Sequence, residues 1–294
     1  MGMSVSAIKL YLELHQRGLL DGYRSVIEMG SQELHLKQAD FEQLLLMSGI
    51  SGYQGNDFAP WAWPSMPRCS SKPFFKLLGF SDYASIDLNQ EHGSVGLDLN
   101  YPLEDRSLFC KYDLVTDHGC NEHAFNIAEA YRTMHRLCRS GGLIVIDQGV
   151  WHGNGYYLFD LSFFEGIAAA NYYKVLFSGY VVSLKSTTQN GSNLQFHIPL
   201  SRDLLDAVDL TKVLSIGISY VFQKQSDADF KYPYQGSYLS HREGISGYAL
   251  QFFPDPPART YVPIAPSGSA SHAISSVSAL RRIARKIIHR TTHR

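Results

Sequence analysis

The sequence predicts an α/β fold, with a mostly parallel sheet, an antiparallel C-terminal strand and helices on both faces. Three observations support this prediction. Residues 111–147 pass from a short apolar run through an amphipathic helical pattern to a second apolar run. Acids or glycines follow successive apolar runs along the chain, as at the strand ends of such sheets. Two long apolar runs near the C-terminus flank a polar turn, which is typical of an antiparallel finish.

The central unit has one strand at 112–116, a helix at 125–137 and a second strand at 143–146. Ser140-Gly141-Gly142 is predicted to end the helix, because glycine readily terminates helices. Strand, helix and strand form a right-handed βαβ unit. Ligands of such sheets bind at the carboxyl ends of the strands. Asp117-His118-Gly119 lies there after the first strand and Asp147-Gln148-Gly149 after the second, and this is where we expect the chemistry.

The remaining elements follow from periodicity and from glycine-rich breaks. Only residues 89–94 separate two of the predicted strands, so this link is either a bare loop or one of the two strands is wrong. The predicted elements are helix 6–20, strand 23–29, a helix from Leu34 to Leu46, helix 71–78, strands 83–88 and 95–99, helix 161–171, strand 173–184, a surface turn at 186–193 and strand 213–223.

Four segments are expected along the chain. They are an N-terminal helix at 1–22, an α/β domain at 23–225, an extension and linker at 226–278, and a basic amphipathic tail at 279–294. Residues 50–69 interrupt the alternation and contain two tryptophans and three prolines, which is typical of a lid or a covering insertion.

Composition excludes some classes of function. The net charge of −1 provides no global attraction to nucleic acid. Four cysteines without a CxxC pair indicate reduced thiols in a cytoplasmic protein. No apolar stretch approaches the ~18 residues of a membrane span. The basic tail could lie on an anionic membrane surface or remain a solvated terminus.

Acids stand at or near four predicted strand ends: Glu28, Asp87, Asp98 and Asp117. A carboxylate at such an end can accept hydrogen bonds from a ribose diol, an adenine amine or an ammonium group. Any one of these acids alone is more often a cap or turn residue than a ligand contact. Their repetition along the alternation favours a ligand site.

The motifs VIEMG, YASIDL, GLDLNYPL, YDLVTDHG and LCRSGGLIVI resemble those of the class I (Rossmann-like) S-adenosylmethionine-dependent methyltransferases. The resemblance implies S-adenosyl-L-methionine as cofactor, with the first acid and glycine at its methionine moiety, the second acid at the ribose and the third at adenine. The glycine-rich loop of the family is reduced here to one glycine, and NQEHGS replaces the helix between its second and third strands. The implied cofactor-binding residues are Glu28, Gly30, Asp87, Leu88, Asp98, Asp117 and His118.

Three histidines, His118, His123 and His152, are predicted at the carboxyl edge beside Asp117. A neutral imidazole there could take the proton of a hydroxyl or amine acceptor. Capping or turn roles are the alternatives. The spacing of the histidines and cysteines does not match a zinc site, so no metal is predicted.

Glu122 and the aromatic residues Trp151, Tyr156 and Tyr157 are predicted to contact the methyl acceptor. We expect O-methylation of a small molecule or glycan by in-line transfer, since aromatic loops suit such substrates. N-methylation of a small molecule or peptide and a non-catalytic binding or scaffold role are the alternatives. A nicotinamide dinucleotide is disfavoured because GxGxxG is missing.

Overall fold

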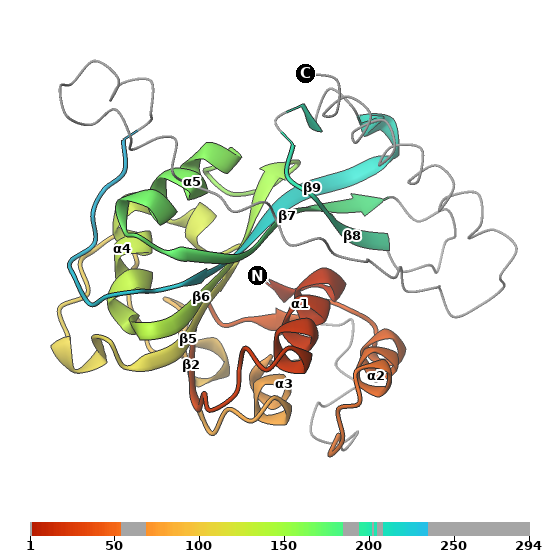
Figure 1. The fold of residues 1–294 in the computed structure, drawn as a ribbon, viewed down its shortest axis with the longest axis horizontal. Coiled ribbons are helices and arrows are strands. Elements are labelled where there is room, and N and C mark those ends of the chain that lie inside the picture. The colour runs from red at the N-terminus through yellow and green to blue at the C-terminus, as the bar shows by residue number, and fades with distance from the viewer. Residues whose placement is uncertain (1, 54–68, 185–193, 202, 205–207, 235–294) are drawn as a thin grey trace, which may run out of the picture.

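The computed structural model describes residues 2–53, 69–184, 194–201, 203–204 and 208–234. A seven-stranded sheet runs through the molecule, and a two-stranded sheet lies beside it (Figure 1). The strands are β1 (Gly2–Met3), β2 (Ser25–Met29), β3 (Glu33–Leu34), β4 (Asp82–Ile86), β5 (Tyr112–His118), β6 (Cys138–Trp151), β7 (Lys174–Leu184), β8 (Leu194–Ile198) and β9 (Val213–Gln223). The helices are α1 (Val5–Gln16), α2 (Gln38–Met47), α3 (Lys72–Leu77), α4 (Ile127–Leu137) and α5 (Leu161–Ala170).

The order of strands in the large sheet is β4-β2-β5-β6-β9-β7-β8. The first four strands are parallel to one another, whereas β9 runs antiparallel between β6 and β7. The predicted fold class is therefore confirmed, including the reversed C-terminal strand.

Helices cover both faces of the sheet. Helices α4 and α5 lie on one face, and α1, α2 and α3 lie on the other (Figure 1). Apolar side chains alternate between the two faces along each strand, since successive residues of a strand point in opposite directions. In β5, for example, Val115 packs in the core under α4 and α5, while Leu114 packs in the core under α1. Two cores thus hold the strand ends in place.

The predicted helix from Leu34 to Leu46 begins later than expected. Leu34 belongs to β3, which pairs in parallel with β1 at the N-terminus, and α2 starts only at Gln38. The prediction was wrong because the pairing of Leu34 with Met3 is long-range and leaves no local pattern. No helix therefore begins directly at the glycine turn after β2.

The predicted strand 95–99 is reduced to one parallel bridge between Val95 and Ile86. The rest of this segment is irregular, so the open question is settled against that strand. The glycines of Ser140-Gly141-Gly142 were also misread as a stop between helix and strand. Helix α4 ends at Leu137, β6 starts at once, and Gly141 and Gly142 lie where its pairing with β5 shifts register.

The other predicted elements of the described chain are present within a few residues, namely α1, α3, α4, α5, β2, β4, β5, β7 and β9. Strand β8 was missed. The predicted turn at 186–193, most of the insertion at 50–69 and the basic tail at 279–294 lie outside the described residues. Among the helices of the described part, none is long and apolar enough to span a bilayer.

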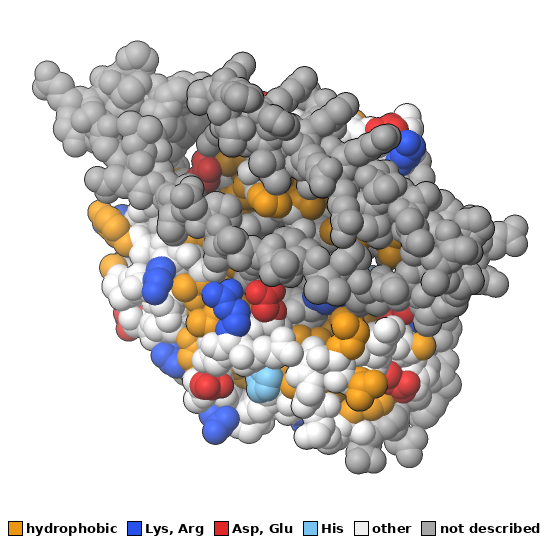
Figure 2. Space-filling view, turned by 45° about the vertical axis from the view of Figure 1, so that its right-hand side comes forward, with side chains coloured by type: hydrophobic (Ala, Val, Ile, Leu, Met, Phe, Trp, Pro, Cys, Tyr) orange, Lys and Arg blue, Asp and Glu red, His pale blue; other side chains and the backbone are white. Residues whose placement is uncertain are grey.

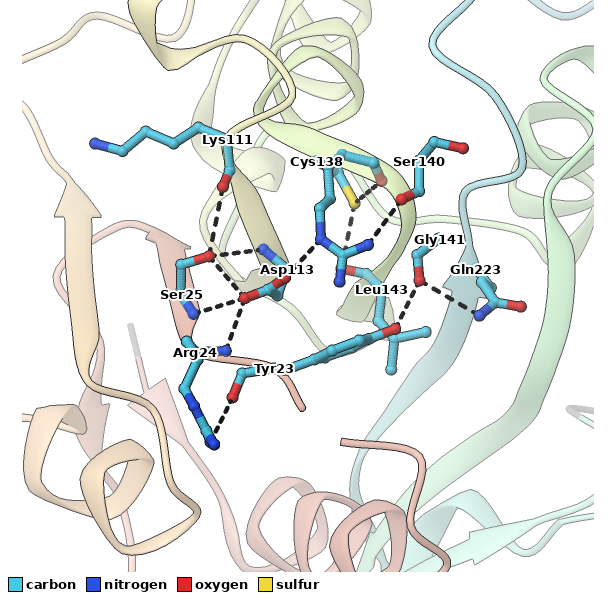
Figure 3. Close-up of polar contacts among 11 residues, drawn as sticks. Tyr23, Arg24, Ser25, Lys111, Asp113, Cys138, Ser140, Gly141, Leu143 and Gln223 are labelled. Carbon is cyan, nitrogen blue, oxygen red and sulfur yellow. Dashed lines mark hydrogen bonds and ion pairs between the residues drawn. The ribbon is translucent and has the colours of Figure 1, made fainter. Parts of the chain in front are cut away.

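The amino ends of the central strands are joined by one half-buried carboxylate, Asp113 of β5 (Figure 3). It accepts hydrogen bonds from the backbone N–H groups of Arg24 and Ser25, at 2.7 and 2.8 Å, and from Arg139 Nε at 2.6 Å. Burial would raise the pKa of Asp113, but these hydrogen bonds outweigh it and lower the pKa below the usual aspartate value. We call Asp113 together with Arg24, Ser25 and Arg139 the Asp113 cluster. It joins β2 and β6 to β5 at the edge opposite the expected chemistry.

Candidate functional site

The sheet has a topological switch point between β2 and β5. These two strands are neighbours, but the chain leaves β2 toward β4 on one side and leaves β5 toward β6 on the other. In open α/β sheets, ligands bind in the crevice outside the carboxyl ends of the strands at such a point. The segments that meet there are residues 30–32 after β2 and residues 119–122 after β5.

The turn after β2 is tied to the end of β4. Gly30 has φ +80°, a backbone conformation that glycine adopts at little cost, and its N–H donates to the carbonyl of Ile86. The N–H and hydroxyl of Ser31 both donate to Asp87 Oδ2, at 2.9 and 2.8 Å. The other oxygen, Asp87 Oδ1, accepts from the Asn89 N–H at 3.2 Å. Asp87 therefore shapes the glycine turn and keeps acceptor capacity on Oδ1.

Glu28 lies below this turn rather than at its surface. Its side chain is fully buried among α1, α3 and β4, and Oε2 accepts hydrogen bonds from Ser71 and Tyr83 at 2.5 Å each. Burial raises the pKa of Glu28 to about 7, although both hydrogen bonds act to lower it. In this structure Glu28 supports the glycine turn from behind.

The raised pKa of Glu28 gives stability a pH dependence. An ordinary glutamate pKa is near 4.5, so between about pH 4.5 and 7 the folded state holds a proton that the unfolded state releases. Stability therefore falls as pH rises through this window. A Glu28→Gln variant cannot lose that proton, so its unfolding free energy relative to wild type should rise by on the order of 2–3 kcal/mol from pH 4.5 to pH 8. Chemical denaturation at several pH values measures this.

Exposed Glu104 provides the control for this measurement. The Glu104→Gln variant should show no such trend against wild type. A difference between Glu28→Gln and wild type that stays constant across the pH range would contradict the assignment.

Asp117 is also fully buried, at the end of β5 and on the opposite face from Glu28. One oxygen accepts from the N–H groups of Cys120 and Asn121, and the other accepts from Gln148 Nε2. Burial raises the pKa of Asp117 to about 7, against the effect of these three hydrogen bonds. The structure thus uses Asp117 to close the turn after β5.

His118 lies at the end of β5 and not on a free loop. Its side chain is 1% exposed, and Nε2 lies 2.8 Å from the hydroxyl of Tyr11 in α1. An acceptor molecule at the surface therefore has no direct access to this ring. Tyr11 was not singled out from the sequence. The acid beside His118, Asp147, was expected at this edge but was given no role.

The other two histidines are exposed. His123 has 41% of its side chain exposed, and Nε2 lies 3.7 Å from Glu122 Oε1. It neither caps nor begins α4, whose N-cap is Asn126. His152 follows β6 at φ +62°, and its ring lies 4.3 Å from that of Trp151 between centroids.

Glu122 fastens the segment that follows β6. Its Oε2 accepts from the N–H of Gly149 at 3.1 Å, and its main-chain carbonyl accepts from the N–H groups of Tyr156 and Tyr157. The Glu122 side chain is 7% exposed. Glu122 therefore holds the loop after β6 in place. We call residues 151–157 the proposed substrate loop.

The aromatic side chains of this loop are partly exposed to solvent. Tyr156 is 73% exposed and packs edge-on against Phe125, which is 75% exposed. Tyr157 is half-buried and donates a hydrogen bond to the carbonyl of Phe125. Trp151 is half-buried. The structure therefore brings Trp151, Tyr156 and Tyr157 to one segment beside Glu122.

The residues expected at adenine lie in the segment after β4. Asp98 accepts from the N–H and the amide of Asn100, whose own side-chain oxygen accepts from the N–H of Asn126 at the start of α4. Leu88 is 68% exposed directly after Asp87. Asp98 is thus a turn residue here, while Leu88 offers a free apolar surface next to Asp87.

Among the residues that the structure describes, no cluster of three or more histidines, cysteines or acids is placed to hold a metal ion. On the face drawn in Figure 2, the visible hydrophobic side chains form several small groups with charged side chains between them. Membrane or partner contact through the basic tail at 279–294 stays a prediction, because the tail lies outside the described residues.

No known protein-family profile matches the chain, and no curated protein matches it. Solved structures with a similar fold include a 1,6-didemethyltoxoflavin-N1-methyltransferase from Burkholderia thailandensis (TM-score 0.37, 11% identity, 76% of this chain and 78% of that one). TehB from Haemophilus influenzae (0.39, 11%, 72% and 62%) and a SAM-dependent methyltransferase from Archaeoglobus fulgidus (0.39, 11%, 75% and 94%) also match. At 11% identity and TM-scores of 0.37 to 0.39, these similarities fix neither the family nor the substrate of this chain.

Proposed function

We propose that the protein is an S-adenosylmethionine-dependent methyltransferase that methylates a hydroxyl oxygen of a small molecule or glycan. One observation carries this proposal. The glycine turn at Gly30, fastened by Ser31 to the strand-end acid Asp87, lies at the switch point between β2 and β5. Ligands of open α/β sheets bind at this place.

Some of the residues at this turn fit an adenosyl cofactor. Asp87 Oδ1 carries one weak hydrogen bond, so it has lone pairs for a ribose diol. Gly30 lets the backbone approach a ligand closely. Leu88 and the segment around Asp98 are the candidate contacts for adenine. When bound, the cofactor supplies an activated methyl group.

Glu28 and Asp117 enter the proposal in an indirect role. Both are fully buried and saturated with donors on at least one oxygen, so they shape the two turns that would face the cofactor. His118 lies behind the same edge. The sequence resemblance had placed all three in contact with the cofactor.

The acceptor would lie between the cofactor and the loop after β6. Exposed Tyr156 and half-buried Trp151 suit the apolar face of an aromatic ring or a sugar. Holding an acceptor in line with the methyl group can account for about 7–11 kcal/mol of the barrier. A base that receives the hydroxyl proton adds to this, and His123 and His152 are exposed near the same edge.

Titration calorimetry with S-adenosylhomocysteine, S-adenosylmethionine and NAD tests this proposal. We expect both adenosyl ligands to bind and NAD not to bind. Failure of both would refute the methyltransferase function. Binding without S-adenosylhomocysteine formation, across a screen of phenols, sugars and amines, would favour a non-catalytic role, and turnover confined to amines would favour N-methylation.

Removing the Asp87 carboxylate should weaken cofactor binding. An Asp87→Ala variant loses both the ribose acceptor and the anchor of the Ser31 turn, at a cost of about 1–3 kcal/mol. This corresponds to roughly tenfold to a hundredfold weaker binding of S-adenosylhomocysteine. Calorimetry gives the dissociation constant.

The matched control is Ser31→Ala, which removes one hydrogen bond of the turn and leaves the Asp87 carboxylate in place. We expect its affinity to fall much less. Equal losses in the two variants would show that Asp87 acts only through the turn.

A further inference from the structure

The hydroxyl group of Tyr11, in helix α1, lies against the sheet behind the proposed site. Tyr11 is fully buried, and its hydroxyl lies 2.8 Å from His118 Nε2. The two rings pack edge-on with centroids 5.6 Å apart. Burial and the nearby charges of Glu28 and Asp147 raise the pKa of Tyr11 well above its usual value. Tyr11 therefore keeps its proton and can donate it to Nε2.

The other ring nitrogen of His118 points toward an acid. Nδ1 is buried and has no hydrogen-bond partner among the described residues. It lies 3.9 Å from Asp147 Oδ2, and His118 and Asp147 are directly opposite in the pairing of β5 with β6. With Tyr11 as the donor to Nε2, the proton of a neutral ring is on Nδ1 and faces this carboxylate.

Tyr11, His118 and Asp147 form a row, and Asp147 is the residue of this row that reaches the surface. Its side chain is 19% exposed, compared with 1% for His118. Its main-chain carbonyl accepts from the N–H of Gly119, which fixes β6 against the turn at the switch point. The Asp147 carboxylate is therefore held at the edge where the acceptor would lie.

We propose that Asp147 is the catalytic base of the reaction and that His118 and Tyr11 are its positioning residues. This inference rests on the proposed methyltransferase function. As the acceptor oxygen forms its bond to the methyl carbon, the carbon–sulfur bond breaks and its electron pair stays on sulfur. The hydroxyl proton passes to the Asp147 carboxylate, and Nδ1 of His118 lies 3.9 Å behind that carboxylate.

Other groups also face this row. Glu28 of β2 and Asp117 of β5 are the further acids that act on Tyr11 from the sheet, and Asp117 also interacts with His118. From β9, Ser219 lies opposite Asp147 in the pairing and contacts His197 of β8. A pH profile therefore has to be compared between variants rather than read as the titration of one group.

The test uses the full chain and the phenol or sugar that gives the fastest S-adenosylhomocysteine formation in the screen. An Asp147→Asn variant is expected to lose roughly 10²–10⁴ in kcat. Its dissociation constant for S-adenosylhomocysteine should stay within about twofold. Asp147→Glu should recover part of the rate. The control, Asp160→Asn, changes an exposed aspartate that caps α5, and asparagine caps equally well.

The positioning role has a separate readout. ¹⁵N NMR of the His118 ring should show the Nδ1–H tautomer in the wild type and a loss of that tautomer in Tyr11→Phe. The same variant should shift the pH profile of kcat without changing cofactor affinity. The NMR measurement needs no acceptor.

Three results would overturn the inference, and each is distinct from failure of the proposed function. These are full turnover in Asp147→Asn, loss of turnover confined to variants of His123 or His152, and an Nε2–H tautomer of His118 that is the same in the wild type and in Tyr11→Phe. Absence of adenosyl-ligand binding in the wild type would instead refute both the function and the inference.

Discussion

A Lys224→Met variant is expected to lose about 3 kcal/mol of unfolding free energy, the largest stability effect that we predict for one side chain. Lys224 follows β9 and is 1% exposed. Its Nζ donates to the carbonyls of His135 and Cys138, at 2.9 and 2.7 Å, where α4 ends, and pairs with Asp227 at 3.3 Å. Methionine fills similar space but leaves both carbonyls without their donor.

Chemical denaturation measures this loss. Lys212→Met is the control, because Lys212 is 74% exposed and pairs only at the surface with Asp209. The control should change stability by less than about 0.5 kcal/mol. A similarly small effect for Lys224→Met would show that the buried ammonium contributes little to holding α4 against the sheet.

A Gly155→Ala variant is expected to displace the proposed substrate loop and to reduce turnover at least about tenfold, because acceptor alignment would be lost. A Cβ at this position would lie 2.7–2.8 Å from Cγ, Cβ and the main-chain oxygen of Glu122. Glu122 is buried and cannot move away without releasing Gly149 and Tyr156. Affinity for S-adenosylhomocysteine should be unchanged.

Gly153→Ala is the matched control in the same loop. Its Cβ would meet only the end of the Leu158 side chain, which is 52% exposed and can turn aside. Steady-state kinetics with the best acceptor of the screen compares the two variants. Equal activity of Gly155→Ala and Gly153→Ala would show that the loop does not depend on its contact with Glu122.

The parts of the fold that could be predicted are those whose signal is local. The unit from β5 through α4 to β6 shows its apolar runs and helical spacing within 37 residues, and β7 and β9 are long apolar runs. Strand β3 could not be predicted, because its partner β1 lies 30 residues away in the sequence. The strand expected at 95–99 is reduced to one bridge. Val95 bonds to Ser85 and Asp87 on either side of Ile86, but the Leu97 N–H turns back to the carbonyl of Val95, so no continuous pairing with β4 forms.

The sequence placed the candidate residues at one edge of the sheet but did not show how deeply they are buried. The acids and glycines after β2, β4 and β5 do lie at the carboxyl ends of these strands. Their burial was hidden, since Glu28 is covered by Ser71 and Tyr83 and His118 by Tyr11, residues 43 to 107 positions away. Asp147 was expected at the same edge, because it follows the second apolar run of the central unit as Asp117 follows the first, but its contact with His118 leaves no local pattern.

The central claim is that an adenosyl cofactor binds at the switch point between β2 and β5. Hydrogen–deuterium exchange with and without saturating S-adenosylhomocysteine tests it most directly. The account predicts slower exchange at residues 30–32, 87–89 and 119–122, and no change at the Asp113 cluster on the opposite edge. Slowing confined to that opposite edge, or no slowing anywhere, would contradict it.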